Sequence, residues 1–182
     1  MPLLNAITTP YAEAFLQVCE SRGETDQAVD QARELLTLWH GSPELREAMA
    51  SPVIEAQAKK AALTGLFGTS LSPAFLNLLK LLTDRQRIGF LDAVLERLLE
   101  LYREQRGIAL ATVTSASPLS DDQQTMLVEK IKAVAGTDRV EVNQQQDPAL
   151  IGGFVLRVGS KVIDASLAGQ IRRLGLELAK VS

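Results

Sequence analysis

"LYREQRGIALATVTSASP", residues 101–118, changes the spacing of its apolar residues at Gly107. Before the glycine, apolar residues recur at intervals of three and four, which predicts an amphipathic helix that ends just ahead of it. After it, residues 108–116 alternate in side-chain type and are rich in β-branched residues, which predicts a strand. We therefore place a domain boundary here, with residues 1–106 in one domain and residues 107–182 in the other.

The first domain is predicted to be a bundle of helices. Serine or threonine followed by proline is typical of a helix start, because the hydroxyl caps the helix and proline fits its first turn. This pair begins four predicted helices, at Thr9-Pro10, Ser42-Pro43, Ser51-Pro52 and Ser72-Pro73. Five or six helices joined by short connections indicate an α-bundle.

The tail, "GGFVLRVGSKVIDASLAGQIRRL" at residues 152–174, predicts a β-hairpin and a final helix. Its Gly159-Ser160-Lys161 does not form a phosphate-binding loop, because the spacing G-x-x-x-x-G-K-[ST] is absent. These residues suit a two-residue turn between strands at 154–158 and 161–164. In the helix that follows, Gly169 costs about 1 kcal/mol relative to alanine, which suggests that another backbone packs closely there. The second domain is thus predicted as a small α/β unit with a hairpin, and the whole chain as α+β.

Composition narrows the possible classes of function. The chain has 182 residues, a formal net charge of −3 and a pI of about 5.3, so it lacks the basic field typical of nucleic-acid binding. Cys19 is the one cysteine, which excludes an internal disulfide and favours a reducing compartment. The most apolar window, residues 74–82, is far shorter than the ~20 residues that span a bilayer, and residues 1–10 show no secretory signal. We expect a soluble protein with no nucleic-acid partner and no membrane span.

The sequence shows no pattern that predicts catalysis, a metal or a cofactor. His40, the single histidine, is expected to cap the predicted second helix rather than to serve a catalytic triad. Cys19 lacks partners at metal-ligand spacing and is expected to be a packing residue. The Asp121-Asp122 pair falls in a predicted first helical turn, where carboxylates meet the positive end of the helix dipole. An enzyme built from carboxylates distant in sequence remains an alternative.

Three segments resemble the delta subunit of rotary, F-type ATP synthases, whose mitochondrial counterpart is the oligomycin-sensitivity-conferring protein. They are "PYAEAF" at residues 10–15, the middle segment at residues 78–120, and the tail from Asp147 to Leu174, which carries D-P-x-L-I-G-G, the hairpin and I-D-x-S-L. The likeness covers nearly the whole chain in the right order. Ala165, where the family often has glycine, is one departure.

This resemblance implies a non-catalytic stator subunit without a cofactor. In the family, an N-terminal six-helix bundle sits on the catalytic head and receives N-terminal segments of the alpha subunits. The C-terminal domain meets the far ends of the peripheral-stalk b subunits, so that the head does not turn with the central rotor. The chain would then be a peripheral membrane protein on the cytoplasmic or stroma-like side of an energy-transducing membrane, plasma or thylakoid.

The resemblance also indicates two sets of contact residues. For the alpha-subunit segments, we expect an apolar groove between the first and fifth helices, formed by Tyr11, Ala14, Phe15, Leu76, Leu79 and Lys80. For the b subunits, we expect the final helix to contribute Leu167, Gln170, Ile171, Arg172, Arg173 and Leu174. Alternatively, Phe15 and Leu79 belong to the internal core of the bundle. It is equally consistent with the sequence that Arg172 and Arg173 are solvent-exposed without a partner.

Three other hypotheses stay open from the residues alone. A helical-bundle enzyme with a site between the domains predicts turnover of a metabolite by the purified chain. A nucleic-acid regulator predicts salt-sensitive DNA binding, which the net negative charge disfavours. An adaptor in another assembly predicts binding to components other than those of a rotary motor.

Overall fold

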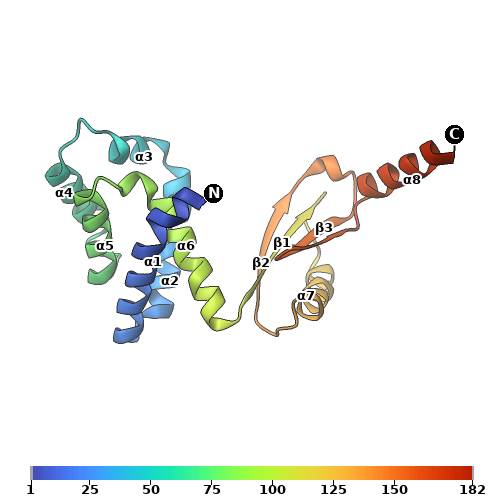
Figure 1. Ribbon diagram of the computed structural model, residues 1–182, viewed down its shortest axis with the longest axis horizontal. Helices are drawn as coiled ribbons and strands as arrows, with labels where there is room; N and C mark the ends of the chain where they lie inside the picture. The colour runs from blue at the N-terminus through green and yellow to red at the C-terminus, as the bar shows by residue number, and fades with distance from the viewer. Residues whose placement is uncertain (1, 182) are drawn as a thin grey trace. The chain divides into compact units, whose positions relative to one another are not determined.

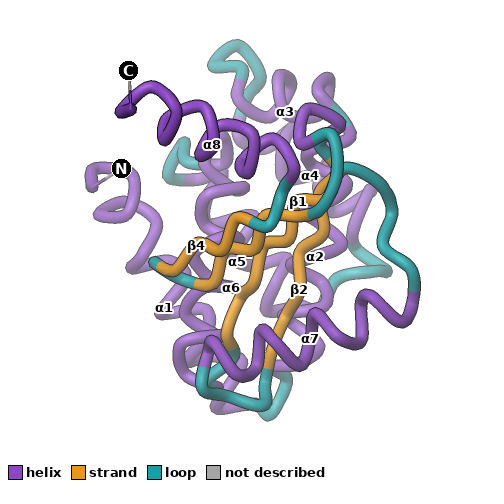
Figure 2. The backbone as a smooth tube through the Cα atoms, turned by 90° about the vertical axis from the view of Figure 1, so that its right-hand side faces the viewer, coloured by secondary structure: helices purple, strands orange, loops and turns teal. Residues whose placement is uncertain are grey.

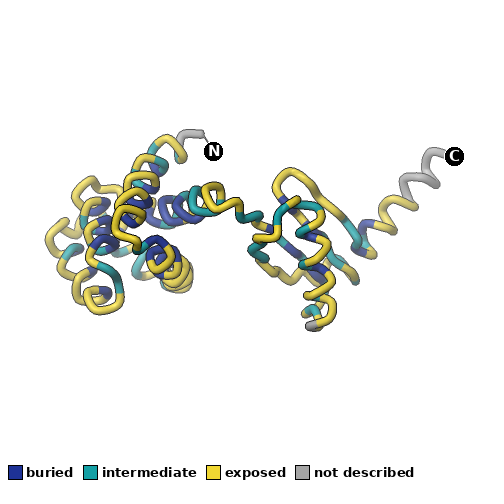
Figure 3. Tube along the Cα trace, turned by 90° about the horizontal axis from the view of Figure 1, so that it is seen from below, coloured by how far each residue is buried: buried dark blue, intermediate teal, exposed yellow. Residues whose placement is uncertain are grey.

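The computed structural model describes the backbone of residues 2–181 and the side chains of residues 4–120 and 122–174. The chain forms two compact units, and the division falls between Tyr102 and Arg103. Each unit has its own buried core, which Figure 3 shows by colour. The first unit is helical and the second combines helices with a sheet.

The first unit is a bundle of helices joined by short connections (Figure 1). Within residues 2–106, its α-helices are α1 (Pro2–Arg22), α2 (Thr25–Gly41), α3 (Pro43–Ala50), α4 (Ala56–Phe67), α5 (Pro73–Asp84) and α6 (Leu91–Arg106), the last of which continues into the second unit. A 3-10 turn, η1 (Ile88–Phe90), precedes α6. The predicted six-helix bundle is confirmed.

Two of the four predicted helix starts, Ser42-Pro43 and Ser72-Pro73, are correct. The other two are wrong. Helix α1 passes through Pro10, although the missing N–H of proline removes one internal hydrogen bond. Helix α4 begins only at Ala56, because residues 51–55 lie in the loop and turn before it. Serine-proline and threonine-proline pairs suit turns as well as helix starts, so the pairs alone do not separate the two cases.

Leucine, alanine and a few aromatic residues fill the core of the bundle. Phe15 of α1 meets Phe75 of α5 edge to face, with ring centroids 5.0 Å apart. Trp39 is also buried in this core. Cys19 is 1% exposed, and its burial, followed by the nearby Glu24 carboxylate, raises the pKa of the thiol to about 11. Cys19 is therefore a packing residue, as predicted.

The second unit is built on a small mixed sheet (Figures 1 and 2). Its elements are β1 (Ala109–Ser115), α7 (Asp121–Ala135), β2 (Val140–Gln146), the 3-10 turn η2 (Pro148–Leu150), β3 (Phe154–Val158), β4 (Lys161–Asp164) and α8 (Leu167–Val181). The strand order is β2-β1-β3-β4, with β1 and β2 parallel and the other two pairs antiparallel. Strands β3 and β4 form the predicted hairpin, with Gly159 at φ +56° in its turn.

Helix α7 covers one face of this sheet (Figure 1). Because alternate residues of a strand share a face, Ala111 and Val113 of β1 point the same way, and Val113 lies opposite Leu156 of β3. All three are almost fully buried and form one cluster with Leu127 and Ile131 of α7. The parallel β1–α7–β2 connection thus supplies the core of the second unit.

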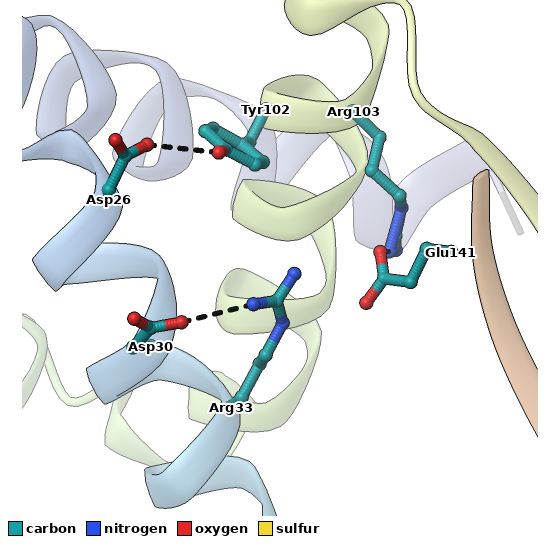
Figure 4. A network of polar contacts seen from close by, with 6 residues as sticks. All are labelled: Asp26, Asp30, Arg33, Tyr102, Arg103 and Glu141. Carbon is teal, nitrogen blue, oxygen red and sulfur yellow. Dashed lines mark hydrogen bonds and ion pairs between the residues drawn. The ribbon is translucent and has the colours of Figure 1, made fainter. Parts of the chain in front are cut away.

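Two polar contacts lie on either side of the division between the units (Figure 4). The Tyr102 hydroxyl donates a hydrogen bond to Asp26 of α2 at 3.0 Å, within the first unit. Within the second, a guanidinium nitrogen of Arg103 lies 3.5 Å from a carboxylate oxygen of Glu141 on β2. Consecutive side chains of α6 therefore belong to different units. The boundary predicted after residue 106 lies at the end of α6, where Gly107 has φ +64°.

Candidate docking surfaces

A groove of about 450 Å³ lies between α1 and α5. Its lining residues are Pro10, Tyr11, Ala14, Phe15, Val18 and Arg22 from α1, and Ala74, Asn77, Leu78 and Leu81 from α5. The lining is mostly apolar, and Val18 and Leu81 are 41% and 44% exposed. A shallow apolar groove between two helices is the kind of surface that binds an amphipathic helix.

The structure brings together the α1 half of the predicted groove but not the α5 half. The predicted residues that line it are Tyr11, Ala14 and Phe15. Leu79 is fully buried in the bundle core, and Leu76 and Lys80 do not line the groove. The residues of α5 that do line it are spaced by three and four, as one helix face requires. The face of α5 that lines this groove therefore differs from the one predicted for the alpha-subunit contact.

Phe15 and Tyr11 show how α1 shapes this groove. Phe15 is 5% exposed, belongs to the bundle core and also lines the groove. At the rim, a guanidinium nitrogen of Arg87 donates a hydrogen bond to the Tyr11 hydroxyl at 2.8 Å, and its central carbon lies 5.6 Å from the ring centroid. This contact fixes Tyr11 against the turn that follows α5.

The second candidate surface is the exposed apolar face of α8. Leu167, Ile171 and Leu174 follow one another at intervals of four and three, and are 47%, 60% and 60% exposed. The polar residues predicted for this surface are exposed as well: Gln170, Arg172 and Arg173. Large apolar side chains that share one exposed helix face indicate an interaction surface.

Two adjacent glycines let the chain ahead of β3 pass close to the start of α8. A Cβ atom on Gly152 would lie 2.7 Å from the Cδ1 atom of Leu167, and one on Gly153 would overlap the carbonyl oxygen of Ala165. Gly153 also has φ +76°, which side chains disfavour. The Leu167 N–H donates to the Gly152 carbonyl at 2.9 Å. These glycines therefore fix the point at which α8 leaves the sheet.

Asp164 and Ser166 cap the start of α8. One carboxylate oxygen of Asp164 accepts hydrogen bonds from the Ser166 N–H at 2.9 Å and from its hydroxyl at 2.6 Å. The Ser166 oxygen in turn accepts from the Gly169 N–H at 3.0 Å. A Cβ atom on Gly169 would overlap both carboxylate oxygens of Asp164. The close neighbour that the sequence suggested to be a backbone is therefore the Asp164 side chain.

Acid should loosen the start of α8. Hydrogen bonds from the Ser166 hydroxyl and then from its N–H lower the pKa of Asp164 below its ordinary value of 3.8, and Arg173 and Arg172 add to this. A carboxyl group with a lowered pKa stabilises the fold above its unfolded pKa, and this contribution is lost as the pH falls through the folded value. Protection of the amides of residues 166–170 from hydrogen exchange should therefore fall below about pH 4. The fall should be absent in Asp164→Asn, and its persistence there would assign it to another group.

The residues considered above for chemistry lie at helix ends. His40 lies in the last turn of α2. Asp121-Asp122 follow Ser120, the N-cap of α7. The Ser120 side-chain oxygen accepts from the Gln123 N–H, and the Gln123 side chain accepts from the Ser120 N–H, so the two residues form a capping box. Among the residues whose placement is described, no group of three His, Cys, Asp or Glu side chains could hold a metal ion. Nor does any helix of that part of the chain have the length and apolar character to cross a membrane.

Comparison with known proteins identifies the family. The family described as ATP synthase delta (OSCP) subunit matches residues 7–178. The chain belongs to this family. The ATP synthase subunit delta of Prochlorococcus marinus (strain MIT 9303) is 71% identical over 182 residues, which is 100% of both chains. That of Synechococcus sp. (strain RCC307) is 62% identical over 180 residues, 99% of both chains.

The fold agrees with a solved structure as well. A chain in the cryo-EM structure of the Toxoplasma gondii mitochondrial ATP synthase hexamer superposes with a TM-score of 0.75, at 20% identity, over 93% of this chain and 96% of that one. As a delta (OSCP) subunit, the chain is a structural, non-catalytic subunit of ATP synthase. It is a component of the stator, which links the head to the peripheral stalk, and it assembles with other subunits of this membrane-associated complex. The family therefore sets aside the enzyme, nucleic-acid and other-assembly hypotheses.

Proposed function

We propose that the α1–α5 groove receives N-terminal segments of the alpha subunits, and that α8 binds the C-terminal ends of the peripheral-stalk b subunits. In this arrangement residues 1–106 hold the catalytic head and residues 107–182 hold the stalk. The subunit works on the cytoplasmic or stroma-like side of a plasma or thylakoid membrane. The observation that supports the proposal most is that each unit exposes one apolar surface suited to a foreign helix.

The groove can bind an amphipathic helix through the apolar side chains that it leaves in water. Val18 and Leu81 stand partly exposed on opposite helices, and Leu78 lines the groove as well. Burial of apolar surface contributes roughly 25 cal/mol per Å². Arg22 and Asn77 add polar groups to the lining, which can set the direction of the bound segment.

Helix α8 can bind the stalk by helix-to-helix packing. The spacing of Leu167, Ile171 and Leu174 forms an apolar stripe of the kind that packs against a second helix. Exposed arginines next to this stripe, Arg172 and Arg173, can pair with carboxylates at the edge of the contact. The attachment of α8 through Gly153 and Asp164 then transmits load from the stalk to the sheet.

Two docking surfaces on one chain make a durable joint from moderate contacts. A nanomolar dissociation constant corresponds to a binding free energy of about −12 kcal/mol. When one contact has formed, the second becomes intramolecular, and the linkage can raise the overall affinity by about 10²–10⁴-fold. A stator that must survive many turns of the rotor therefore gains from separate contacts to the head and to the stalk.

Replacing Ile171 by aspartate should detach the chain from the stalk and leave it on the head. The contact would bury the new carboxylate without a partner, so stalk affinity should fall by at least about tenfold. Met126→Asp is the matched control, because Met126 is 65% exposed on a different helix of the same unit, α7.

Reconstitution tests this prediction together with the proposed function. Membranes stripped of this subunit should regain proton-coupled ATP synthesis with the unchanged chain and with Met126→Asp, but much less with Ile171→Asp. ATP hydrolysis by the free head should be the same with all three. Failure of the unchanged chain would reject the proposed function, whereas equal synthesis with Ile171→Asp would reject only the place of α8 in it.

A further inference from the structure

Ile151 has a backbone conformation that is unusual for its residue type. It follows the 3-10 turn η2 and adopts φ +64° and ψ −40°. The Gly152 N–H donates a hydrogen bond to the Leu150 carbonyl at 2.7 Å, so Ile151 is the central residue of a γ-turn with positive φ, which is the rare and strained form. A β-branched residue with such a φ is an outlier, because its side chain crowds the backbone.

Hydrogen bonds to the end of β1 hold the segment that carries Ile151. Before it, the Asp147 N–H donates to the Ser115 carbonyl at 2.9 Å. After it, the Gly153 carbonyl accepts from the Ala116 N–H at 3.3 Å. A strained conformation persists only where the surrounding structure determines it, and such conformations concentrate at functional sites. The segment is therefore a fixed support for the Ile151 side chain.

The isolated chain gains little from an isoleucine at this position. The side chain is 67% exposed, so most of it contributes nothing to the core. A glycine would adopt the same φ without strain. The residue thus combines an unfavourable backbone conformation with a large apolar side chain in water. A contact with a partner protein would offset both costs.

Gln86 provides the contrasting case. Within the backbone that the structure describes, it is the one residue besides Ile151 and the glycines that has a positive φ, of +56°. Its N–H donates to the Thr83 carbonyl at 3.0 Å. The N–H of Arg87 donates to the Leu82 carbonyl at 2.7 Å, and the two bonds form a Schellman motif that ends α5. The positive φ of Gln86 therefore has an explanation within the fold, which the exposed side chain of Ile151 lacks.

Ile151 lies beside the first turn of α8. The turn before it, η2, lies against α8. The residue after it, Gly152, leaves room for Leu167, whose Cδ1 atom would lie 2.7 Å from a Cβ atom on the glycine. Leu167 and Ile171 of α8 are 47% and 60% exposed. Ile151 thus adds a large exposed apolar side chain at the start of the α8 surface.

We propose that Ile151 is a contact residue for the peripheral stalk, held in its strained turn so that its side chain packs against the b-subunit segment bound to α8. This inference rests on the proposed function of α8 and adds a contact that lies outside that helix. An isoleucine side chain offers neither charge nor hydrogen bond, so it meets an apolar part of the stalk. Because the turn is already fixed, binding does not have to order it, and this pre-organisation favours affinity.

The test measures the stability of the full chain and its affinity for the stalk in parallel. Ile151→Gly should melt at the same temperature as the unchanged chain or higher, because the backbone strain is removed. Its affinity for purified b subunits, measured by calorimetric titration, should fall by about tenfold, because the isoleucine side chain is no longer buried on binding. A lower melting temperature or an unchanged affinity would overturn the proposal.

Two further variants separate the side chain from the backbone. Ile151→Thr keeps the β-branched shape, and hence the strain, but replaces apolar surface by a hydroxyl. It should also weaken stalk binding, and normal binding would show that the apolar side chain makes no contact. Gln86→Gly is the matched control, because it relieves a positive φ at an exposed residue of the first unit. It should keep the affinity for the stalk, and an equal loss there would contradict a specific role of Ile151.

Two comparisons show which hypothesis fails if the result is negative. If Ile171→Asp binds the stalk normally, α8 is not the stalk surface and the proposed function fails with this inference. If Ile171→Asp loses affinity and Ile151→Gly does not, only the inference about Ile151 is wrong. The amide signals of residues 167–174 in free Ile151→Gly should match those of the unchanged chain. A displaced α8 would explain a loss of affinity without any contact by Ile151, and would also overturn the proposal.

Discussion

Replacing Leu81 by aspartate should weaken binding of the chain to the catalytic head by about a hundredfold or more. Leu81 lines the α1–α5 groove and is 44% exposed, so the folded chain tolerates a polar side chain at this position. A helix bound in the groove would cover the new carboxylate and leave it without a partner. The loss of about 3 kcal/mol expected for such a group corresponds to this change in affinity.

Leu66→Asp is the matched control for this variant. Leu66 is 58% exposed on α4 and does not line the groove. Both variants should change the free energy of unfolding by no more than about 0.5 kcal/mol, because both sites are surface positions. Calorimetric titration of each chain into heads that lack this subunit would check the difference. Normal binding by Leu81→Asp, or equal losses in the two variants, would show that the head does not use this groove.

The α1 side of the groove could be predicted from the sequence, whereas the α5 side could not. In α1, polar residues separate the apolar ones, so the sequence shows which side of the helix is apolar. In α5, the run "AFLNLLKLL" at residues 74–82 is apolar on most of its circumference. Leu78 lines the groove and its neighbour Leu79 is fully buried, and only the packing against the other helices separates these two leucines.

The order of elements in the second unit followed from local patterns, but the role of its glycines did not. The change in apolar spacing at Gly107 correctly predicts the end of α6 and the start of β1, and Gly159 correctly predicts the turn between β3 and β4. Both patterns involve only residues close together in the sequence. Gly169 packs against the Asp164 carboxylate, which folds back onto the helix that it caps. The γ-turn at Ile151 was not foreseen, because its positive φ is rare for a β-branched residue and the hydrogen bonds that hold its segment come from the end of β1.

Replacing Gly153 by alanine should destabilise the second unit by about 2–5 kcal/mol. Two effects add at this position. The backbone has φ +76°, which costs an alanine roughly 1–2 kcal/mol. The new methyl group would also overlap the carbonyl oxygen of Ala165, and the backbone shift needed to relieve this costs about 1–3 kcal/mol. Because Ala165 lies between β4 and α8, the shift should also displace the surface proposed for the stalk.

Gly159→Ala separates the two effects within the same unit. Gly159 also has a positive φ, of +56°, but a Cβ atom there would meet no other atom within 4 Å. Gly159→Ala should therefore lose only the stability that the positive φ costs an alanine, roughly 1–2 kcal/mol. Denaturant unfolding followed through the amide signals of β1 would give both values, and a stalk-binding assay should show a deficit only for Gly153→Ala. If the two variants lose the same stability and bind the stalk equally well, the backbone angle alone requires glycine at residue 153, and contact with Ala165 plays no part in holding α8.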